Sequence, residues 1–213
     1  MGNRLSKIYT RTGDDGSTGM ADGSRASKAD NLFSVMGDID ELNSHIGLVR
    51  AHLTQAITDN ETPNKQQLPE RLQQKELGFV QALIIIQHLL FNIGGELAMP
   101  EYEGVSATHI EWLEQQIDAM NTTLPPLKDF ILPTGSVLVS QLHVARTVCR
   151  RAERQAVLLQ QERSQAIRGT AVSFINRLSD WLFVAARFCT DPEQVSEVLW
   201  NSKVLEAFTT NNK

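Results

Sequence analysis

A run of small, hydroxyl-bearing and charged residues near the N-terminus has the composition of an anion-binding loop. Thr10–Gly19 reads TRTGDDGSTG. Glycines let backbone N–H groups turn toward an anion, hydroxyl groups add donors, and Lys28 can reach a phosphate as a point charge. The run lacks the Gly-Lys-Ser/Thr ending of a Walker A loop and the spaced carboxylates and final glutamate of a calcium loop. On composition alone, a solvated turn is the better explanation, because Asp-Gly is a common turn dipeptide.

A stripe of arginines later in the chain could also bind an anion. Arg146, Arg150 and Arg154 recur at every fourth position, so on a helix they drift only about 80° and share one face. Guanidinium groups match phosphate and carboxylate oxygens in a bidentate way. The alternative is a solvated face paired with acids of neighbouring helices, in which Glu153 would take part. The spacing leaves both interpretations open.

Two more polar clusters fall within apolar helical patterns. In Gly37–Asn43, Asp40 and Asn43 lie off the apolar stripe, and Asn176 and Asp180 are four residues apart on one face. Asparagine is a mediocre helix former, so we expect a partner to hold the amide of Asn176. For any one of these residues, an ordinary contact between helices is the plainer explanation.

The elements that must position these residues are predicted to be helices, because apolar residues recur at spacings of three and four. The predicted helices are Phe33–Leu53, Lys75–Ala98, Thr108–Met120, Val137–Gln161 and Thr170–Cys189. No segment alternates like a strand. Small residues along the fourth apolar stripe predict close approach of its neighbours. The expected fold class is therefore all-α: a five-helix bundle with a glycine-rich N-terminal arm.

The segments between the helices set the predicted boundaries. Thr54–Leu72 is polar and contains two prolines, and Leu124–Gly135 contains three, so these are predicted as a linker and a turn. We expect a single domain over residues 1–213, in which residues 1–30 form the loop arm and residues 33–190 the bundle. Residues 191–213 form a separate C-terminal segment of open role.

Composition and charge limit the class of protein. The chain has 213 residues, of which 41% are hydrophobic and 21% charged, and its formal net charge of -5 argues against a basic nucleic-acid binder. The five histidines are scattered without metal-ligand spacing, so no metal ligands are expected. Cys149 and Cys189 are unclustered, which favours a reducing compartment over a disulfide framework.

No membrane signal is visible in the sequence. Met1–Thr10 lacks the apolar core of a signal peptide, and the longest apolar run, Ala82–Ile86, is too short to span a bilayer. Met1–Ser6 fits the loose N-myristoylation pattern, but so short a pattern is expected to match by chance. We therefore expect a cytoplasmic protein with no membrane or nucleic-acid partner.

Taken together, the motifs resemble one known family. The chain is similar to the ATP:cob(I)alamin adenosyltransferases of the type found with diol-utilisation proteins and in animal mitochondria. The matching stretches are Tyr9–Asp14, Gly37–Asn43, Phe130–Pro133, Arg146–Arg154 and Asn176–Asp180. They follow the family order from residue 9 to about residue 188. Each motif alone is modest, but five in order are highly specific.

The resemblance implies a role for each matching residue. It implies that the arm wraps the triphosphate of ATP through Thr10, Arg11, Thr12, Gly13, Thr18, Gly19 and Lys28. It implies that the ATP site is completed by Arg150, Arg151, Glu153, Arg154 and Asn176, with Arg150 on the phosphates. Asp40 and Arg146 match a pair thought to bridge subunits near the corrin, and with Arg150 they are the catalytic candidates. Phe130 matches an aromatic residue of the cobalamin site that helps keep the lower axial face of cobalt free of its base.

The resemblance also implies the reaction. Cob(I)alamin attacks C5′ of ATP, and adenosylcobalamin and inorganic triphosphate are formed without a protein nucleophile or general base. Guanidinium groups, Lys28 and backbone N–H groups suit the growing negative charge of the leaving group. Mg²⁺ on the triphosphate, a homotrimer with active sites between subunits, an external reductase and an adenosylcobalamin-dependent partner enzyme are implied in the same way.

Two alternatives stay open at this point. The first is a module that binds ATP or a corrinoid in order to deliver or sense the cofactor. The second is a purely structural helical bundle, in which loss of the Arg150 side chain would change neither ligand binding nor stability.

Overall fold

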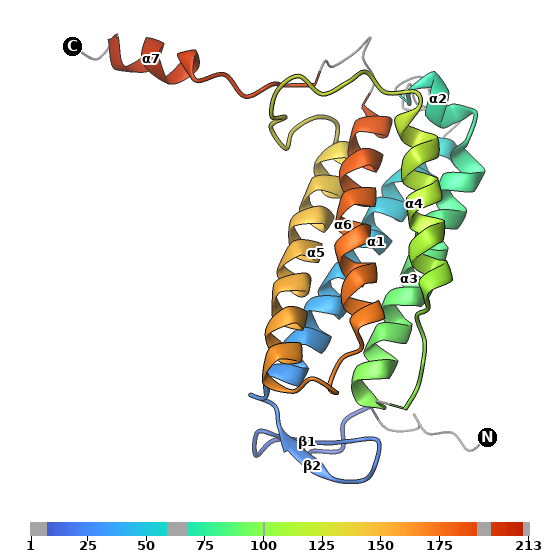
Figure 1. The fold of residues 1–213 in the computed structure, drawn as a ribbon, viewed down its shortest axis with the longest axis vertical. Helices are drawn as coiled ribbons and strands as arrows, with labels where there is room; N and C mark the ends of the chain where they lie inside the picture. The colour runs from blue at the N-terminus through green and yellow to red at the C-terminus, as the bar shows by residue number, and fades with distance from the viewer. Residues whose placement is uncertain (1–7, 59–67, 100, 191–196, 211–213) are drawn as a thin grey trace.

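The structure is a computed structural model that describes residues 8–58, 68–99, 101–190 and 197–210. Over these residues the chain forms helices and one pair of short strands, so the prediction of an all-α class is confirmed. The longer helices are α1 (Asn31–Thr58), α3 (Glu76–Ala98), α4 (Ala107–Asn121), α5 (Val137–Glu162) and α6 (Gly169–Cys189). They lie side by side, and successive ones alternate in direction (Figure 1). Two short helices, α2 (Glu70–Gln73) and α7 (Lys203–Thr210), accompany them.

The hydrophobic core lies along the facing stripes of these helices. α1 packs against α3 and α5, and α6 packs against α4 and α5. The stripe predicted for the first helix is buried, namely Ile39, Leu42, Ile46, Val49 and Leu53. On α5 the small residues Ala145, Cys149 and Ala152 have no exposed surface, which lets both neighbouring helices approach closely. Each fully buried Leu or Ile contributes about 1.5–3 kcal/mol relative to an exposed one.

Helix α3 is the most apolar of the five long helices. By length and composition alone, Gly78–Ala98 could cross a membrane, with a mean hydropathy of 1.4. Its side chains Leu83, Ile86, Leu90 and Ile93 are fully buried in the bundle. Packing in the protein core therefore accounts for part of the apolar content of this helix, of which 39% is buried.

Besides the two short helices α2 and α7, which the sequence analysis does not predict, two features differ from the sequence prediction. β1 (Ser17–Gly19) and β2 (Arg25–Ser27) form an antiparallel pair in the arm, with Thr18 opposite Ala26. Strands of three residues are too short to show alternation in a sequence. Helix α1 also continues through Thr54–Thr58, where we predict a linker, and at the other end of that segment Leu72 is fully buried. Residues 59–67 of the predicted linker lie outside the described residues.

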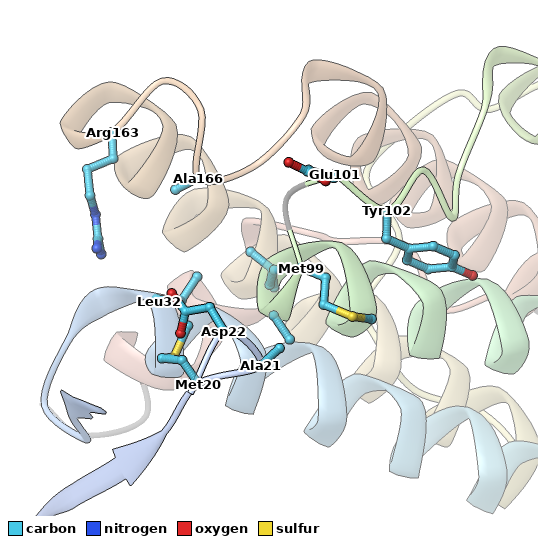
Figure 2. Close-up of a pocket in the computed structure, with 11 residues that line it drawn as sticks. Met20, Ala21, Asp22, Leu32, Met99, Glu101, Tyr102, Arg163 and Ala166 are labelled. Carbon is cyan, nitrogen blue, oxygen red and sulfur yellow. The ribbon is translucent and has the colours of Figure 1, made fainter. Parts of the chain in front are cut away.

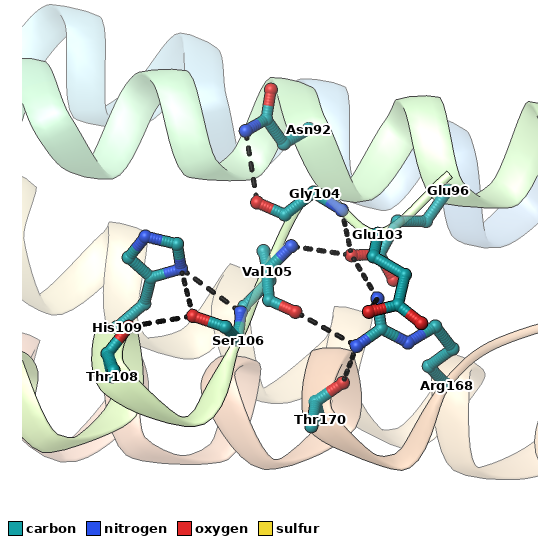
Figure 3. Close-up of polar contacts among 10 residues, drawn as sticks. All are labelled: Asn92, Glu96, Glu103, Gly104, Val105, Ser106, Thr108, His109, Arg168 and Thr170. Carbon is teal, nitrogen blue, oxygen red and sulfur yellow. Dashed lines mark hydrogen bonds and ion pairs between the residues drawn. The ribbon is translucent and has the colours of Figure 1, made fainter. Parts of the chain in front are cut away.

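A buried polar network ties the connections together at the end of the bundle that carries the arm. The carboxylate of Glu96, a 3% exposed residue, accepts hydrogen bonds from the backbone N–H groups of Gly104 and Val105 at 2.9 and 2.7 Å (Figure 3). The Arg168 guanidinium lies 3.5 Å from the same oxygen and donates to the Val105 carbonyl at 3.1 Å. Buried charges persist only when paired, so this network fixes the end of α3 against the start of α6.

Candidate functional site

The N-terminal arm encloses a small polar hollow of about 290 Å³. The residues that line it are Tyr9, Thr10, Arg11, Thr12, Gly13, Asp14, Ser17, Thr18, Gly19, Arg25 and Lys28. Every arm residue that the sequence predicts for the triphosphate is among them. The structure therefore brings the predicted hydroxyl groups, glycines and lysine together around one space.

Backbone turns and one lysine hold the arm in shape. Lys28 donates from its Nζ to the carbonyl of Gly13 at 2.7 Å and from its backbone N–H to the carbonyl of Gly16 at 2.9 Å. A Cβ atom on Gly13 would lie 2.9 Å from the carbonyl oxygen of Ser17 and 3.1 Å from Lys28 Nζ, so only glycine fits there. Gly16 has a φ of 84°, a left-handed conformation that glycine adopts without strain.

Arg25 is a site residue that the sequence analysis missed. Its guanidinium lies at the hollow and donates to the Thr12 carbonyl and to the Ser17 hydroxyl. It also lies 3.6 Å from the carboxylate of Asp15. Hydrogen bonds from the Ser17 hydroxyl and backbone N–H hold the pKa of Asp15 below its ordinary value, and Arg25 adds to this. The pairing of β1 with β2 brings Arg25 here, and such short strands leave no signal in the sequence.

The arginine stripe on α5 carries charges with no counter-ion in the described part of the chain. Arg150 and Arg154 are exposed and Arg146 is partly buried, and no ion pair joins any of them to a described residue. The Nε atom of Arg146 is buried without a hydrogen-bond partner. Burial, and then the neighbouring Arg150, lower the pKa of Arg146. Among the described residues, the stripe is thus not paired with acids of neighbouring helices.

Glu153 and Asn176 link α5 to α6 beside the stripe. The Asn176 amide donates to the Glu153 carboxylate at 2.7 Å. The prediction that a partner holds this amide is confirmed. The bond fixes one carboxylate oxygen and one amide next to the unpaired guanidinium groups of Arg150 and Arg154.

Of the acidic residues in the first half of α1, some form ion pairs with α5 and one does not. Asp38 and Glu41 both pair with the guanidinium of Arg151, Asp38 at 3.0 Å. Partial burial would lower the pKa of Arg151, but the two carboxylates raise it above its ordinary value. Asp40, in contrast, is exposed and makes no ion pair with Arg146 or with another residue in the described ranges.

Phe130 belongs to the connection between α4 and α5. This connection lies at the end of the bundle opposite to the arm (Figure 1). Its side chain is 83% exposed. Its backbone carbonyl accepts a hydrogen bond from the N–H of Trp200 at 2.7 Å, beside an antiparallel bridge between Ile131 and Leu199. One chain therefore holds the arm hollow, the arginine stripe and Phe130 in three separate places.

A second hollow, of about 830 Å³, lies between the tip of the arm and the bundle (Figure 2). Apolar side chains such as Met20, Leu32 and Met99 line much of it, and none of the predicted site residues does. Its arginine, Arg163, is already paired with Asp30. A triphosphate needs several cationic or N–H donors, so the smaller arm hollow suits it better.

Comparison with known proteins gives a consistent result. A family model described as cobalamin adenosyltransferase matches residues 8–189. The chain is 44% identical to a cobalamin adenosyltransferase of Cupriavidus metallidurans, over 94% of this chain and 97% of the relative. It is 37% identical to the human corrinoid adenosyltransferase MMAB, over 92% of this chain and 74% of the relative.

Solved structures agree with these relatives. A variant of the PduO-type ATP:corrinoid adenosyltransferase from Lactobacillus reuteri, in complex with cobalamin and ATP, superimposes with a TM-score of 0.76. The two chains are 36% identical, and the match covers 92% of this chain and 100% of the other.

Proposed function

Because the chain belongs to the cobalamin adenosyltransferase family, we infer that it transfers the 5′-deoxyadenosyl group of ATP to cob(I)alamin, releasing inorganic triphosphate. Its substrates are ATP and a corrinoid. The observation in this chain that carries the inference is the arm hollow, where hydroxyl groups, a glycine turn, Arg25 and Lys28 surround one polar space.

The arm is proposed as the triphosphate site. Thr10, Thr12 and Thr18 supply hydroxyl donors, and Lys28 supplies a point charge. Arg11, Gly13 and Gly19 complete the predicted set. Arg25 joins that set on the strength of its place in the hollow. Mg²⁺ would arrive with ATP as the counter-ion of the triphosphate.

The face of α5 and α6 is proposed as the rest of the ATP site. Arg150 and Arg154 have no ionic partner among the described residues, although Arg154 donates a hydrogen bond to the Arg150 carbonyl at 3.0 Å. Glu153 and Asn176 add fixed acceptor and amide groups. Arg151 belongs to the predicted set, but Asp38 and Glu41 hold it. We therefore propose that Arg151 supports the site by holding α1 against α5.

A homotrimer with active sites between subunits would supply the contacts that the arm hollow, Asp40 and Arg146 lack among the described residues of one chain. Among the described residues only those of the arm line the arm hollow, and we propose that the arginine stripe of another subunit completes it. Asp40 and Arg146 each lack an ionic partner in the described part of one chain, and the Nε atom of Arg146 is buried without an acceptor. A second copy would supply both: its α5 face to the arm, and its Arg146 to Asp40.

The residue types suit the reaction. The cobalt nucleophile belongs to the corrin substrate, so the protein must orient the reactants and stabilise charge. As the bond from C5′ to the triphosphate oxygen breaks, negative charge grows on the leaving group. Arg150 and Lys28 are proposed to stabilise that charge, and preorganised donors of this kind are worth about 10²–10³ in kcat each.

The remaining assignments follow from the same family membership. Phe130, which exposes its ring, is proposed to cover the lower axial face of cobalt. The whole chain is proposed to act as one domain, with a five-helix bundle and an ATP-binding arm. Both cysteines are free and buried, which suits the reducing cytoplasm. A reductase that supplies the electron for Co(II), and an enzyme that uses adenosylcobalamin, are the expected protein partners.

An anaerobic assay with MgATP and chemically reduced cobalamin tests the proposal. Adenosylcobalamin, followed by its absorbance, and one intact triphosphate per turnover are expected. Arg150→Ala should lower kcat about 100-fold. Arg177→Ala is a matched control on the neighbouring helix, because Arg177 is already paired with Glu114 at 3.0 Å. Tight ATP binding without product would instead show a delivery or sensor protein.

A further inference from the structure

An ion pair between a buried arginine and a partly buried glutamate lies where the C-terminal segment meets the loop that carries Phe130. The Arg187 guanidinium, on the last turn of α6, donates to the Glu197 carboxylate from Nε at 2.7 Å and from a terminal nitrogen at 3.3 Å. The same terminal nitrogen donates to the carbonyl of Pro125 at 2.8 Å. Arg187 is only 4% exposed. One side chain of α6 therefore holds both the segment after it and the loop before α5.

Backbone hydrogen bonds join the segment after Glu197 to the loop that contains Phe130. The N–H of Leu132 donates to the carbonyl of Val198 at 2.8 Å, and the N–H of Trp200 donates to the carbonyl of Phe130 at 2.7 Å. Phe130 itself is 83% exposed, so side-chain packing does little to fix its position. Its place depends on the backbone pairing, and that pairing begins at the residue after Glu197.

We propose that Arg187 and Glu197 are positioning residues for Phe130: their ion pair docks Val198–Trp200 against the loop, and the docked backbone holds the ring at the lower face of the corrin. The inference rests on the proposed function, in which Phe130 keeps the lower base off cobalt. A buried guanidinium without its carboxylate is strongly unfavourable, so the segment docks as the pair forms.

Loss of the ion pair between Arg187 and Glu197 should slow the reaction only for corrinoids that have a lower base. Cobalamin carries such a base, and cobinamide does not. A misplaced Phe130 should therefore slow reaction with cob(II)alamin but leave reaction with cob(II)inamide nearly unchanged. A merely structural ion pair would affect both substrates alike.

The experiment measures adenosylation of both corrinoids, anaerobically, with MgATP and an excess of one chemical reductant. For Glu197→Gln we expect the ratio of the cobalamin rate to the cobinamide rate to fall about tenfold, since misplacing a group by ~1 Å can cost up to ~100-fold. Glu197→Asp, which keeps the charge, should restore most of the ratio. Glu96→Gln is the matched control: it weakens a buried pair at the arm end of the bundle and should leave the ratio unchanged.

A double variant tests the route through Phe130. If Glu197 acts only by positioning that ring, Phe130→Ala/Glu197→Gln should be no worse with cobalamin than Phe130→Ala alone. An unchanged ratio in Glu197→Gln, an equal loss on both corrinoids, or a further loss in the double variant would each overturn the inference. Failure of the unmodified enzyme to adenosylate either corrinoid would instead overturn the proposed function.

Discussion

Replacing Gly13 with alanine should damage the ATP site while leaving the bundle intact. A Cβ atom there would lie 2.9 Å from the Ser17 carbonyl oxygen, closer than real Cβ atoms approach backbone. It would also lie 3.1 Å from Lys28 Nζ, which donates to the Gly13 carbonyl. The turn must therefore open, and Lys28 must leave its present position.

The size of the effect follows from the hydrogen bond that a displaced Lys28 could no longer donate to the triphosphate. A hydrogen bond to a charged group contributes about 1.5–3 kcal/mol, and 1.4 kcal/mol corresponds to tenfold in affinity. We expect ATP to bind about 10- to 100-fold more weakly to Gly13→Ala. The midpoint of thermal unfolding should barely change, because the arm lies outside the bundle core (Figure 1).

Titration calorimetry with MgATP and thermal unfolding followed by circular dichroism measure the two quantities. Gly94→Ala is the matched control, because a Cβ atom at Gly94 in α3 meets nothing within 4 Å. It should keep the ATP affinity and stabilise the helix by up to ~1 kcal/mol. Wild-type ATP affinity in Gly13→Ala would refute the assignment of the arm as the triphosphate site.

Three further predictions concern single residues. Asp40→Asn should raise KM for the corrinoid and leave ATP binding unchanged; equal loss of both would contradict its place beside the corrin. Burial, and then Arg146, lower the pKa of His143, with Glu197 acting in the opposite direction. The folded protein thus binds this proton less readily than the unfolded chain, so stability is full above pH ~6.5 and falls as the pH drops below it, by up to ~1.4 kcal/mol per pH unit. Denaturant unfolding from pH 8 to pH 5 should show a flatter profile in His143→Gln. Burial raises the pKa of Cys189 to about 12 and also raises the pKa of Cys149, so neither thiol should react with a disulfide reagent at pH 8 until denaturant is added; labelling of the native protein would contradict this.

The helical core could be predicted from sequence because its signals are local. Spacings of three and four in α1 and α5 place Leu42, Ile46 and Ala152 on buried faces, and the structure buries all three. Leu72 was missed because polar neighbours and prolines dominate its segment. Its burial depends on the contacts of α2 with α3 and with α6, and α6 is distant in sequence.

The sequence predicts which residue types form the candidate site, but it does not predict which of these residues contact one another. Composition points to the arm, yet the place of Arg25 depends on a turn that reverses the chain between β1 and β2. Spacing puts Arg150 on an arginine face but cannot tell a solvated stripe from a paired one. The contact of Arg187 with Glu197 was missed for a similar reason, since nothing local marks either residue as a partner of the other.

The unpaired stripe on α5 gives this acidic protein a local field of opposite sign to its net charge. At a distance, a chain of net charge -5 repels a nucleotide anion. Ions at physiological strength screen that repulsion beyond about 8 Å, so at the proposed site an approaching ATP molecule would respond first to Arg150 and Arg154. Capture of the nucleotide is then governed by the nearest few side chains, and the overall acidity of the protein carries little weight in how quickly its substrate arrives.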